Sequence, residues 1–242
     1  MARERIDVLL VQRGLCPSRE KAQRVVMAGE VFIGGTRAEK PSQLVAPDAP
    51  LEVRGADRYV GRGGYKLEAA LAAFGINPSG WVCLDVGAST GGFTDCLLQH
   101  GAAKVYALDV GHGQLAWSLR NDPRVVVMEH ANARHLQPED LPEKVRLAVA
   151  DVSFISLTLV LPPVAAVLTD DGMIVALIKP QFELSRDEVG RGGIVRSEAA
   201  HARAVQKIAD FAARSGWTWG GVTDSPITGA DGNREFLCLL RP

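Results

Sequence analysis

The sequence lacks a hydrophobic run long enough to cross a membrane. Its most apolar stretches are interrupted, as at Pro162-Pro163, or short, as at residues 173 to 178, whereas a membrane helix needs about 20 apolar residues. The first residues already carry acidic side chains, which are not typical of a secretion signal. We therefore expect a cytoplasmic protein with no membrane partner.

Cysteine and histidine are also scarce. The four cysteines, at positions 16, 83, 96 and 238, form no Cys-x-x-Cys pair, and the five histidines show no metal-ligand spacing. We expect small buried thiols and no metal site.

The net charge of -1 conceals an uneven distribution of charge. Residues 1 to 66 hold 12 Lys and Arg against 8 Asp and Glu, whereas the remaining residues hold 15 against 20. A basic front end on an acidic body indicates that the N-terminal part meets a polyanion.

Residues 1 to 58 have the pattern of a small α+β domain. Apolar spacing predicts helices over residues 6 to 13 and 19 to 28, each closed by a glycine. Short strands are expected over residues 31 to 33 and 51 to 53. Residues 59 to 64, rich in glycine and arginine, are expected to be a linker to a larger domain over residues 65 to 242.

Basic side chains gather on the second expected helix, although most such runs are solvated helix faces. The patterns Arg-Ile-Asp-x-Leu-Leu, Ser-Arg-x-x-Ala and Gly-x-Val-x-Ile-x-Gly occur in this order. Together they resemble the RNA-binding domain first defined in bacterial ribosomal protein S-four, over residues 3 to 53. The residues expected to contact RNA are Arg3, Arg5, Arg19, Lys21, Arg24 and Arg62.

Strands and helices alternate in the larger domain. Strands are expected over residues 81 to 86, 103 to 108, 125 to 128, 145 to 150 and 172 to 178, with a closing pair over 218 to 224 and 235 to 240. Helices are expected from residue 65, over residues 157 to 168, where Pro162 and Pro163 would bend or start the helix, and over residues 199 to 215. This alternation predicts an α/β, Rossmann-like fold with a seven-stranded, mostly parallel sheet.

Residues 81 to 94, Trp-Val-Cys-Leu-Asp-Val-Gly-Ala-Ser-Thr-Gly-Gly-Phe-Thr, predict a buried strand, a tight turn and a helix start. The glycines do not follow the Gly-x-Gly-x-x-Gly spacing, which disfavours a nicotinamide cofactor. Asp109 ends the next strand, 24 positions after Asp85. An acid at this position can accept hydrogen bonds from both hydroxyls of a ribose. The two acids would then frame a nucleoside; the simpler alternative is an ordinary turn with solvent-facing acids.

This combination resembles the S-adenosylmethionine-dependent methyltransferases, which are class I methyltransferases with this Rossmann-like fold. The resemblance implies S-adenosyl-L-methionine as the cofactor. The residues expected to bind it are Asp85, Gly87, Ser89, Gly91, Gly92, Phe93, Thr94, Asp109 and Asn132.

Further polar side chains lie at other strand ends. Asp151 and Lys179 each end a strand, Lys66 lies on the helix before the first strand, and Glu235 begins the last strand. A structural ion-pair cluster is one explanation. In this order, however, the four resemble the catalytic Lys-Asp-Lys-Glu tetrad of the FtsJ-type ribose 2'-O-methyltransferases. Residues 3 to 241, with the N-terminal domain and the sequence Lys-Pro-Gln-Phe-Glu, resemble the TlyA, or hemolysin A, family of ribosomal RNA methyltransferases.

The resemblance implies methyl transfer to a ribose 2'-hydroxyl of ribosomal RNA, free or in a ribosomal subunit. Lys179 would accept the proton of the 2'-hydroxyl or stabilise the alkoxide that forms. Asp151 would orient Lys179 and the hydroxyl, and Lys66 with Glu235 would complete the set of charges around them. Base methylation is disfavoured, because the chain shows neither an Asn/Asp-Pro-Pro-Tyr type motif nor a catalytic cysteine. A non-catalytic ribosome-assembly factor and a membrane-active haemolysin are the alternatives from other functional classes.

Overall fold

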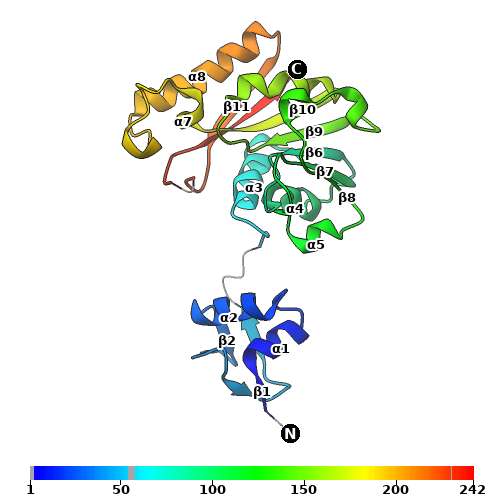
Figure 1. Cartoon of the computed structure of the whole chain (residues 1–242), viewed down its shortest axis with the longest axis vertical. Helices are drawn as coiled ribbons and strands as arrows, with labels where there is room; N and C mark the ends of the chain where they lie inside the picture. The colour runs from blue at the N-terminus through cyan, green and yellow to red at the C-terminus, as the bar shows by residue number, and fades with distance from the viewer. Residues whose placement is uncertain (1–2, 54–57, 230) are drawn as a thin grey trace. The chain divides into compact units, whose positions relative to one another are not determined.

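The chain folds into two units. The computed structural model describes residues 3–53, 58–229 and 231–242, except for the side chain of Arg191. The first unit ends at Arg58 and the second runs from Tyr59 to Pro242 (Figure 1).

The N-terminal unit packs two helices against short strands. Its elements are β1 (Glu4–Arg5), α1 (Ile6–Gln12), α2 (Arg19–Met27), β2 (Val31–Ile33), β3 (Thr36–Arg37), β4 (Leu44–Val45) and β5 (Leu51–Val53). Antiparallel pairing joins β1 to β4 and places β2 between β3 and β5. The hydroxyl of Ser18 accepts a hydrogen bond from the Lys21 N–H and so begins α2, as the sequence predicts. Ala22, Val25 and Val26 recur at helical spacing, and this face closes the core of the unit.

The C-terminal unit is built on one sheet of seven strands in the order β11-β12-β10-β9-β6-β7-β8. In chain order the strands are β6 (Val82–Val86), β7 (Lys104–Leu108), β8 (Val125–Met128), β9 (Val145–Ala150), β10 (Leu168–Ile178), β11 (Thr218–Asp224) and β12 (Phe236–Arg241). The first five are parallel to one another, and β12 lies between β10 and β11 and runs antiparallel to both. The prediction of a seven-stranded, mostly parallel sheet is confirmed.

Helices cover both faces of this sheet (Figure 1). They are α3 (Gly63–Phe74), α4 (Gly92–Gln99), α5 (Trp117–Arg120), α6 (Leu161–Ala166), α7 (Pro180–Glu183) and α8 (Glu198–Arg214). The short 3₁₀ helices are η1 (Ala133–His135), η2 (Pro138–Asp140), η3 (Leu157–Leu159) and η4 (Arg191–Gly193). Consecutive residues of β6 show the division: Cys83 packs with α3 and α4, whereas Leu84 packs with α6 and α8.

The helix expected over residues 157 to 168 starts at its prolines, as the sequence predicts, but it is shorter than expected. The segment forms η3, then α6, and Leu168 already belongs to β10, where it pairs with Val145. Pro162 and Pro163 lie in the first turn of α6, where the missing proline N–H groups would have had no partner within the helix. They therefore start a new short helix inside the predicted one.

The segment over residues 59 to 64, expected to be a linker, is packed into the C-terminal unit. Tyr59 is buried and lies edge-on to Tyr65, and the Val60 N–H donates to the Asp95 carboxylate at 2.8 Å. A Cβ on Gly92 would lie 2.9 Å from the backbone nitrogen of Gly64. Glycine at residue 92 therefore lets the segment that begins α3 approach the start of α4 closely.

Candidate active site

Two adjoining cavities lie at the carboxyl ends of the parallel strands. We call the first the tetrad cavity, because Lys66, Asp151, Lys179 and Glu235 line it; its volume is about 320 Å³. The second, the Asp109 cavity, has the same volume and is lined by Asp109 and Asn132 among others. Gly87, Ser89 and Asp151 line both, so the two cavities meet at the turn after β6.

The four residues of the expected tetrad come together as two ion pairs. Lys66 on α3 places its Nζ 2.6 Å from Oε2 of Glu235, at the start of β12. Lys179, after β10, places its Nζ 2.6 Å from Oδ1 of Asp151, after β9. The second carboxylate oxygen of Asp151 lies 4.0 Å from the Lys66 Nζ and links the two pairs. The site therefore holds two cations and two anions, and all four side chains are mostly buried.

Ser153, which the sequence did not mark, and Phe182, noted there only as part of the Lys-Pro-Gln-Phe-Glu sequence, complete the surroundings of Lys179. Its Nζ donates to the Ser153 hydroxyl at 2.8 Å and lies 5.9 Å from the centre of the Phe182 ring. Phe154 packs on Phe182, with 5.1 Å between ring centres, yet the side chain of Phe154 is 91% exposed. The backbone of Phe154 is left-handed, with φ of 64°, a strained conformation for a bulky residue. Nearness to Asp151 in sequence was the available signal for Ser153.

The turn after β6 brings backbone close to the tetrad. Gly87 has φ of 85°, and a Cβ there would lie 2.4 Å from the carbonyl oxygen of Asp151. Only glycine fits this approach. Ser89 follows with a left-handed backbone, φ of 49°, and its N–H donates to Oδ2 of Asp109 at 2.7 Å.

Asp109 is half-buried at the end of β7. Its Oδ1 accepts from the Gly111 N–H at 2.7 Å, so two backbone N–H groups orient the carboxylate. Each carboxylate oxygen keeps a further lone pair for a ligand. Asn132 shares the cavity and accepts a hydrogen bond from the Arg134 N–H at 3.1 Å. These residue types and positions fit a nucleoside whose ribose hydroxyls need acceptors.

Asp85 does not reach either cavity, which corrects the expectation that it frames the nucleoside directly. Its side chain is fully buried and accepts from the equally buried Thr94 hydroxyl at 2.7 Å. Burial raises the pKa of Asp85 to about 7. Because side chains alternate along a strand, Asp85 points to the face covered by α4. Its hydrogen bond with Thr94 joins the end of β6 to α4 and so stabilises the turn between them. Gly91 also faces away, toward Leu115 and Leu119, whereas Gly92 and Phe93 line the tetrad cavity.

In the N-terminal unit, a buried carboxylate holds two of the expected RNA-binding arginines. Asp7 accepts from Arg5 at 3.0 and 2.9 Å, from Arg19 at 3.0 Å and from Gln23 at 3.0 Å. The side chain of Asp7 has no exposed surface, whereas those of Arg5 and Arg19 are 41% and 55% exposed. The two guanidinium groups are therefore fixed side by side at the surface.

Of the other residues expected to contact RNA, Arg3 and Arg24 lack a buried partner of this kind among the described residues, and Arg62 lies in the C-terminal unit. Arg24 lies 3.8 Å from the exposed Glu20, and Arg3 lines a shallow groove with Arg37. Arg62 lines the tetrad cavity of the C-terminal unit.

Replacing Asp7 by asparagine is expected to destabilise the N-terminal unit by about 2 kcal/mol, because two arginines lose a buried partner. The hydrogen bonds from Arg5 hold the pKa of Asp7 well below its usual range. Since the native pKa lies below the unfolded value of about 4, the stabilisation is complete above about pH 4 and is lost as the pH falls further. Amide hydrogen exchange, followed separately for α1 and α2 between pH 3 and 7, measures both the loss of stability and its pH dependence.

Glu20→Gln is the matched control, because Glu20 lies on the same helix and pairs with an arginine at the exposed surface. Its effect should stay below about 0.5 kcal/mol. An Asp7→Asn protein with unchanged exchange and an unchanged acid response would contradict the role of Asp7.

The described residues contain no helix long and apolar enough to cross a membrane. Within the same part of the chain, no group of three or more His, Cys, Asp or Glu side chains is arranged to hold a metal ion. All four cysteines are free and buried, as the sequence predicts.

Comparisons with known proteins match both units. The model of the FtsJ-like methyltransferases matches residues 59–241, and the model of the S4 domain matches residues 4–50. The 16S/23S rRNA (cytidine-2'-O)-methyltransferase TlyA of Mycobacterium tuberculosis is 50% identical over 241 residues, covering 99% of this chain and 90% of that protein. Hemolysin A of Brachyspira hyodysenteriae is 44% identical over 238 residues, covering 96% and 98%.

A solved structure gives the same result. A protein from Streptococcus thermophilus, provisionally named a hemolysin, superposes with a TM-score of 0.75 at 47% identity, covering 99% of this chain and 88% of that one. The chain therefore belongs to the TlyA, or hemolysin A, family of ribosomal RNA methyltransferases, in which an S4 domain precedes an FtsJ-like methyltransferase domain.

Proposed function

We propose that the chain transfers the methyl group of S-adenosyl-L-methionine to a ribose 2'-hydroxyl of ribosomal RNA. The observation that carries this proposal is the assembly of Lys66, Asp151, Lys179 and Glu235 around one cavity that adjoins the Asp109 cavity. The relative from Mycobacterium tuberculosis, named a cytidine-2'-O-methyltransferase of 16S and 23S rRNA, supports the same reaction.

The cofactor supplies an activated methyl group on a sulfonium. Asp109 would accept hydrogen bonds from its ribose, with Asn132 in the same cavity. The turn at Gly87 and Ser89 would lie under the part of the molecule that bridges the two cavities. The absence of a side chain at Gly87 lets the turn lie directly against the backbone of Asp151.

Lys179 would act on the oxygen that receives the methyl group. A lysine ammonium has three N–H donors; here it donates to the Ser153 hydroxyl and is ion-paired with Asp151 at 2.6 Å. A remaining N–H would donate to the ribose 2'-oxygen and stabilise the negative charge that develops on it. As the new O–C bond forms and the S–C bond breaks, the hydroxyl proton leaves to the Asp151 carboxylate or to water. Lys66 and Glu235, already paired, keep the charges around Asp151 balanced.

Phe154 packs on Phe182 near Lys179 and also lines the Asp109 cavity, and its ring is largely exposed. This exposed ring suits a base whose ribose lies at Lys179. Replacing Phe154 by asparagine keeps a residue that tolerates the left-handed backbone but removes the ring. Methyl transfer at subsaturating RNA is expected to fall about 10-fold, since stacking on an aromatic side chain contributes about 1–3 kcal/mol per base. Steady-state kinetics with varied RNA concentration measure this effect.

Phe154→Trp is the control, because it keeps an aromatic face at the same place. It should retain activity within about 3-fold of the wild type. If the asparagine protein matched the wild type at every RNA concentration, Phe154 would have no part in substrate binding.

Labelled S-adenosylmethionine, incubated with the protein and with purified small subunits, large subunits or bare ribosomal RNA, tests the proposed function. Label in alkali-resistant dinucleotides would establish 2'-O-methylation, because a methylated 2'-oxygen blocks alkaline cleavage. Label in bases alone would overturn the position of the methyl group. Cofactor binding without label in any RNA would favour a non-catalytic binding factor.

A further inference from the structure

We propose that Glu183 is a positioning residue for methyl transfer: it fixes the segment over residues 151–157, which carries Asp151, Ser153 and Phe154, against the segment that carries Lys179. This inference rests on the proposed function. Glu183 lies four positions after Lys179, at the end of α7, and its side chain is almost completely buried. It lines neither of the two cavities, so it would act through its neighbours.

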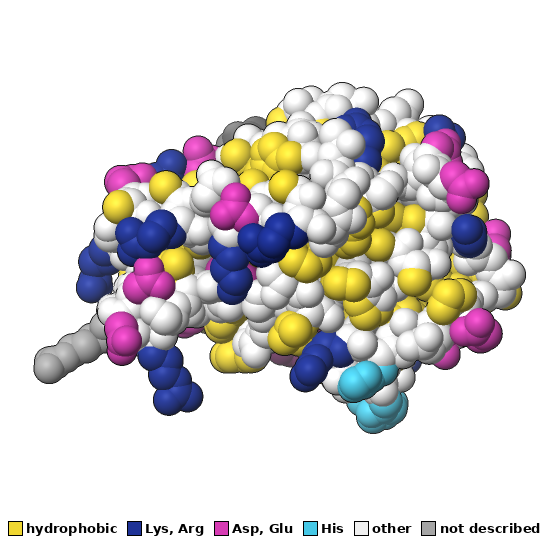
Figure 2. Space-filling model, turned by 90° about the horizontal axis from the view of Figure 1, so that it is seen from above, with side chains coloured by type: hydrophobic (Ala, Val, Ile, Leu, Met, Phe, Trp, Pro, Cys, Tyr) yellow, Lys and Arg dark blue, Asp and Glu magenta, His cyan; other side chains and the backbone are white. Residues whose placement is uncertain are grey.

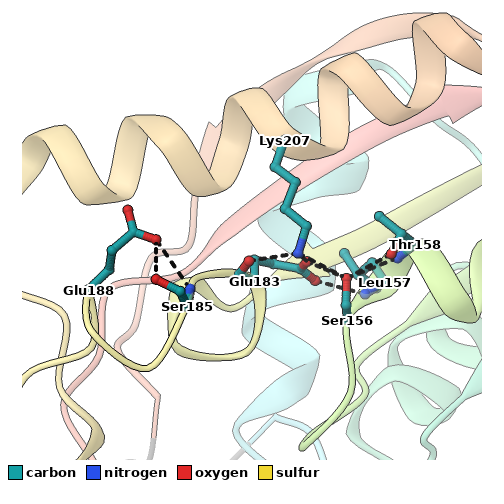
Figure 3. Close-up of polar contacts among 7 residues, drawn as sticks. All are labelled: Ser156, Leu157, Thr158, Glu183, Ser185, Glu188 and Lys207. Atoms are coloured by element: carbon teal, nitrogen blue, oxygen red, sulfur yellow. Dashed lines mark hydrogen bonds and ion pairs between the residues drawn. The ribbon is translucent and has the colours of Figure 1, made fainter.

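Glu183 makes specific contacts to the far end of that segment (Figure 3). Its Oε1 accepts from the Leu157 N–H at 2.7 Å, and its Oε2 accepts from the Ser156 hydroxyl at 2.6 Å. Leu157 is the first residue of η3, whose N–H has no partner within the helix, so the carboxylate caps this helix.

Lys207 of α8 holds the carboxylate from the other side. Its Nζ lies 3.0 Å from Oε2 of Glu183 and donates to the Glu183 carbonyl oxygen at 2.6 Å and to the Ser156 hydroxyl at 3.3 Å (Figure 3). The side chain of Lys207 is 39% exposed, whereas that of Glu183 is 1% exposed. A long helix that packs on the sheet thus anchors the end of α7.

The segment over residues 151–157 is therefore joined to the segment over residues 179–183 at two places. Near the cavity, Lys179 contacts Asp151 and Ser153; at the far end, Glu183 contacts Ser156 and Leu157. The N–H of Asp151 also donates to the Val86 carbonyl oxygen at 2.9 Å, which fixes the start of the first segment.

The strained backbone of Phe154 lies between these two fixed points. A left-handed bulky residue persists only where its surroundings hold it, and the exposed ring of Phe154 gains little from burial. On the C-terminal side Ile155 packs against the core, and the contacts of Glu183 to Ser156 and Leu157 supply the nearest hydrogen-bonded restraint. Without them, the segment is expected to relax, which would move Ser153 away from Lys179 and turn the ring of Phe154.

Glu183→Gln tests this inference, and Glu188→Gln is its matched control. Glu188 follows α7 and accepts from the Ser185 N–H and hydroxyl and from Arg203, without touching the segment over residues 151–157 (Figure 3). For Glu183→Gln we expect kcat at saturating cofactor to fall about 30-fold. Because residues 151–155 also line the Asp109 cavity, cofactor affinity should fall as well, by a smaller factor. Amide exchange over residues 152–158 should accelerate about 10-fold or more, with other segments unchanged. Glu188→Gln should match the wild type in all three measurements.

Ser156→Ala keeps the inference testable if Glu183→Gln fails to fold, because it removes a single hydrogen bond and no charge. It should lower kcat about 5-fold, again with a smaller loss of cofactor affinity. Unchanged exchange over residues 152–158, or acceleration across the whole domain alike, would overturn the positioning role. Exchange is measured without RNA or cofactor, so its outcome is separate from the proposed function, which fails only if the wild-type protein methylates no ribosomal RNA at the 2'-position.

Discussion

Replacing Lys179 by alanine is expected to lower the rate constant of methyl transfer about 1000-fold and to leave cofactor affinity within about twofold of the wild type. Asp151 and Ser153 hold the ammonium group at the tetrad cavity before substrate arrives. A donor that is oriented in advance toward developing negative charge typically contributes about 100-fold to 1000-fold. Loss of the ion pair also frees Asp151 to move. Single-turnover transfer from labelled cofactor measures the rate, and calorimetry measures the affinity.

Lys144→Ala is the matched control for this experiment. Lys144 directly precedes β9, at the amino ends of the strands and away from the cavities. Its side chain is 59% exposed and lies 3.7 Å from Asp170. Its removal should leave the rate unchanged. Lys179→Arg keeps the charge but replaces a compact ammonium with a planar fork, so we expect a loss of about 100-fold. An alanine protein with more than about a tenth of the wild-type rate would show that Lys179 has no direct role in the reaction.

The meeting of Asp151 and Lys179 could be predicted because both follow strands of one parallel sheet, whereas Lys66 and Glu235 were joined to them only through the family resemblance. Asp151 and Lys179 end parallel strands, and parallel strands bring their carboxyl ends to one edge. The pairing itself could not be predicted, since Asp151 lies within 4.0 Å of both lysines. Which lysine it holds at 2.6 Å depends on side-chain packing from four different elements.

The contacts of the segment over residues 151–157 were not predictable from the sequence. Ser153 and Phe154 follow a strand without periodicity, and their directions depend on a left-handed backbone at Phe154. Glu183 was read only as part of a family motif, because its partners Ser156 and Lys207 are 27 and 24 positions away. Such contacts arise from tertiary packing and not from local preference.

For Asp85, by contrast, the sequence predicted a direct ligand contact that the structure does not show. A carboxylate at the end of a central strand suggested a direct ligand, but the period of two along a strand sends alternate side chains to opposite faces. The buried pairing of Asp85 with Thr94 required knowledge that α4 covers this face. In the N-terminal unit, likewise, the sequence predicted a basic surface but not the buried Asp7 that fixes two of its arginines.

Basic side chains do not form a continuous area on the face drawn in Figure 2, where they stand in small groups among acidic and apolar ones. Affinity for RNA on such a surface depends on a few well-placed groups. We expect the fixed pair of Arg5 and Arg19 and the ring of Phe154 to be groups of this kind, and each lies in a different unit. Specific recognition is therefore expected to need both units.

Replacing Asp109 by alanine is expected to weaken the binding of S-adenosylmethionine about 100-fold, or about 2.7 kcal/mol. The carboxylate can accept a hydrogen bond from each hydroxyl of the cofactor ribose, and bonds to a charged acceptor contribute about 1.5–3 kcal/mol each. The N–H groups of Ser89 and Gly111 already orient it, so little is lost in ordering the group on binding. Calorimetric titration of the cofactor measures the change.

Asp122→Ala is the appropriate control, because Asp122 also accepts a backbone hydrogen bond, from the Arg124 N–H at 2.9 Å, but lies outside both cavities. Its cofactor affinity should equal that of the wild type. If Asp109 acts on the ribose alone, saturating cofactor should restore the Asp109→Ala rate to within about 3-fold of the wild type, because the tetrad is untouched. A rate that stays low at saturation would mean that the turn at Ser89 has moved the tetrad, and unchanged affinity would refute the assignment of Asp109 to the ribose.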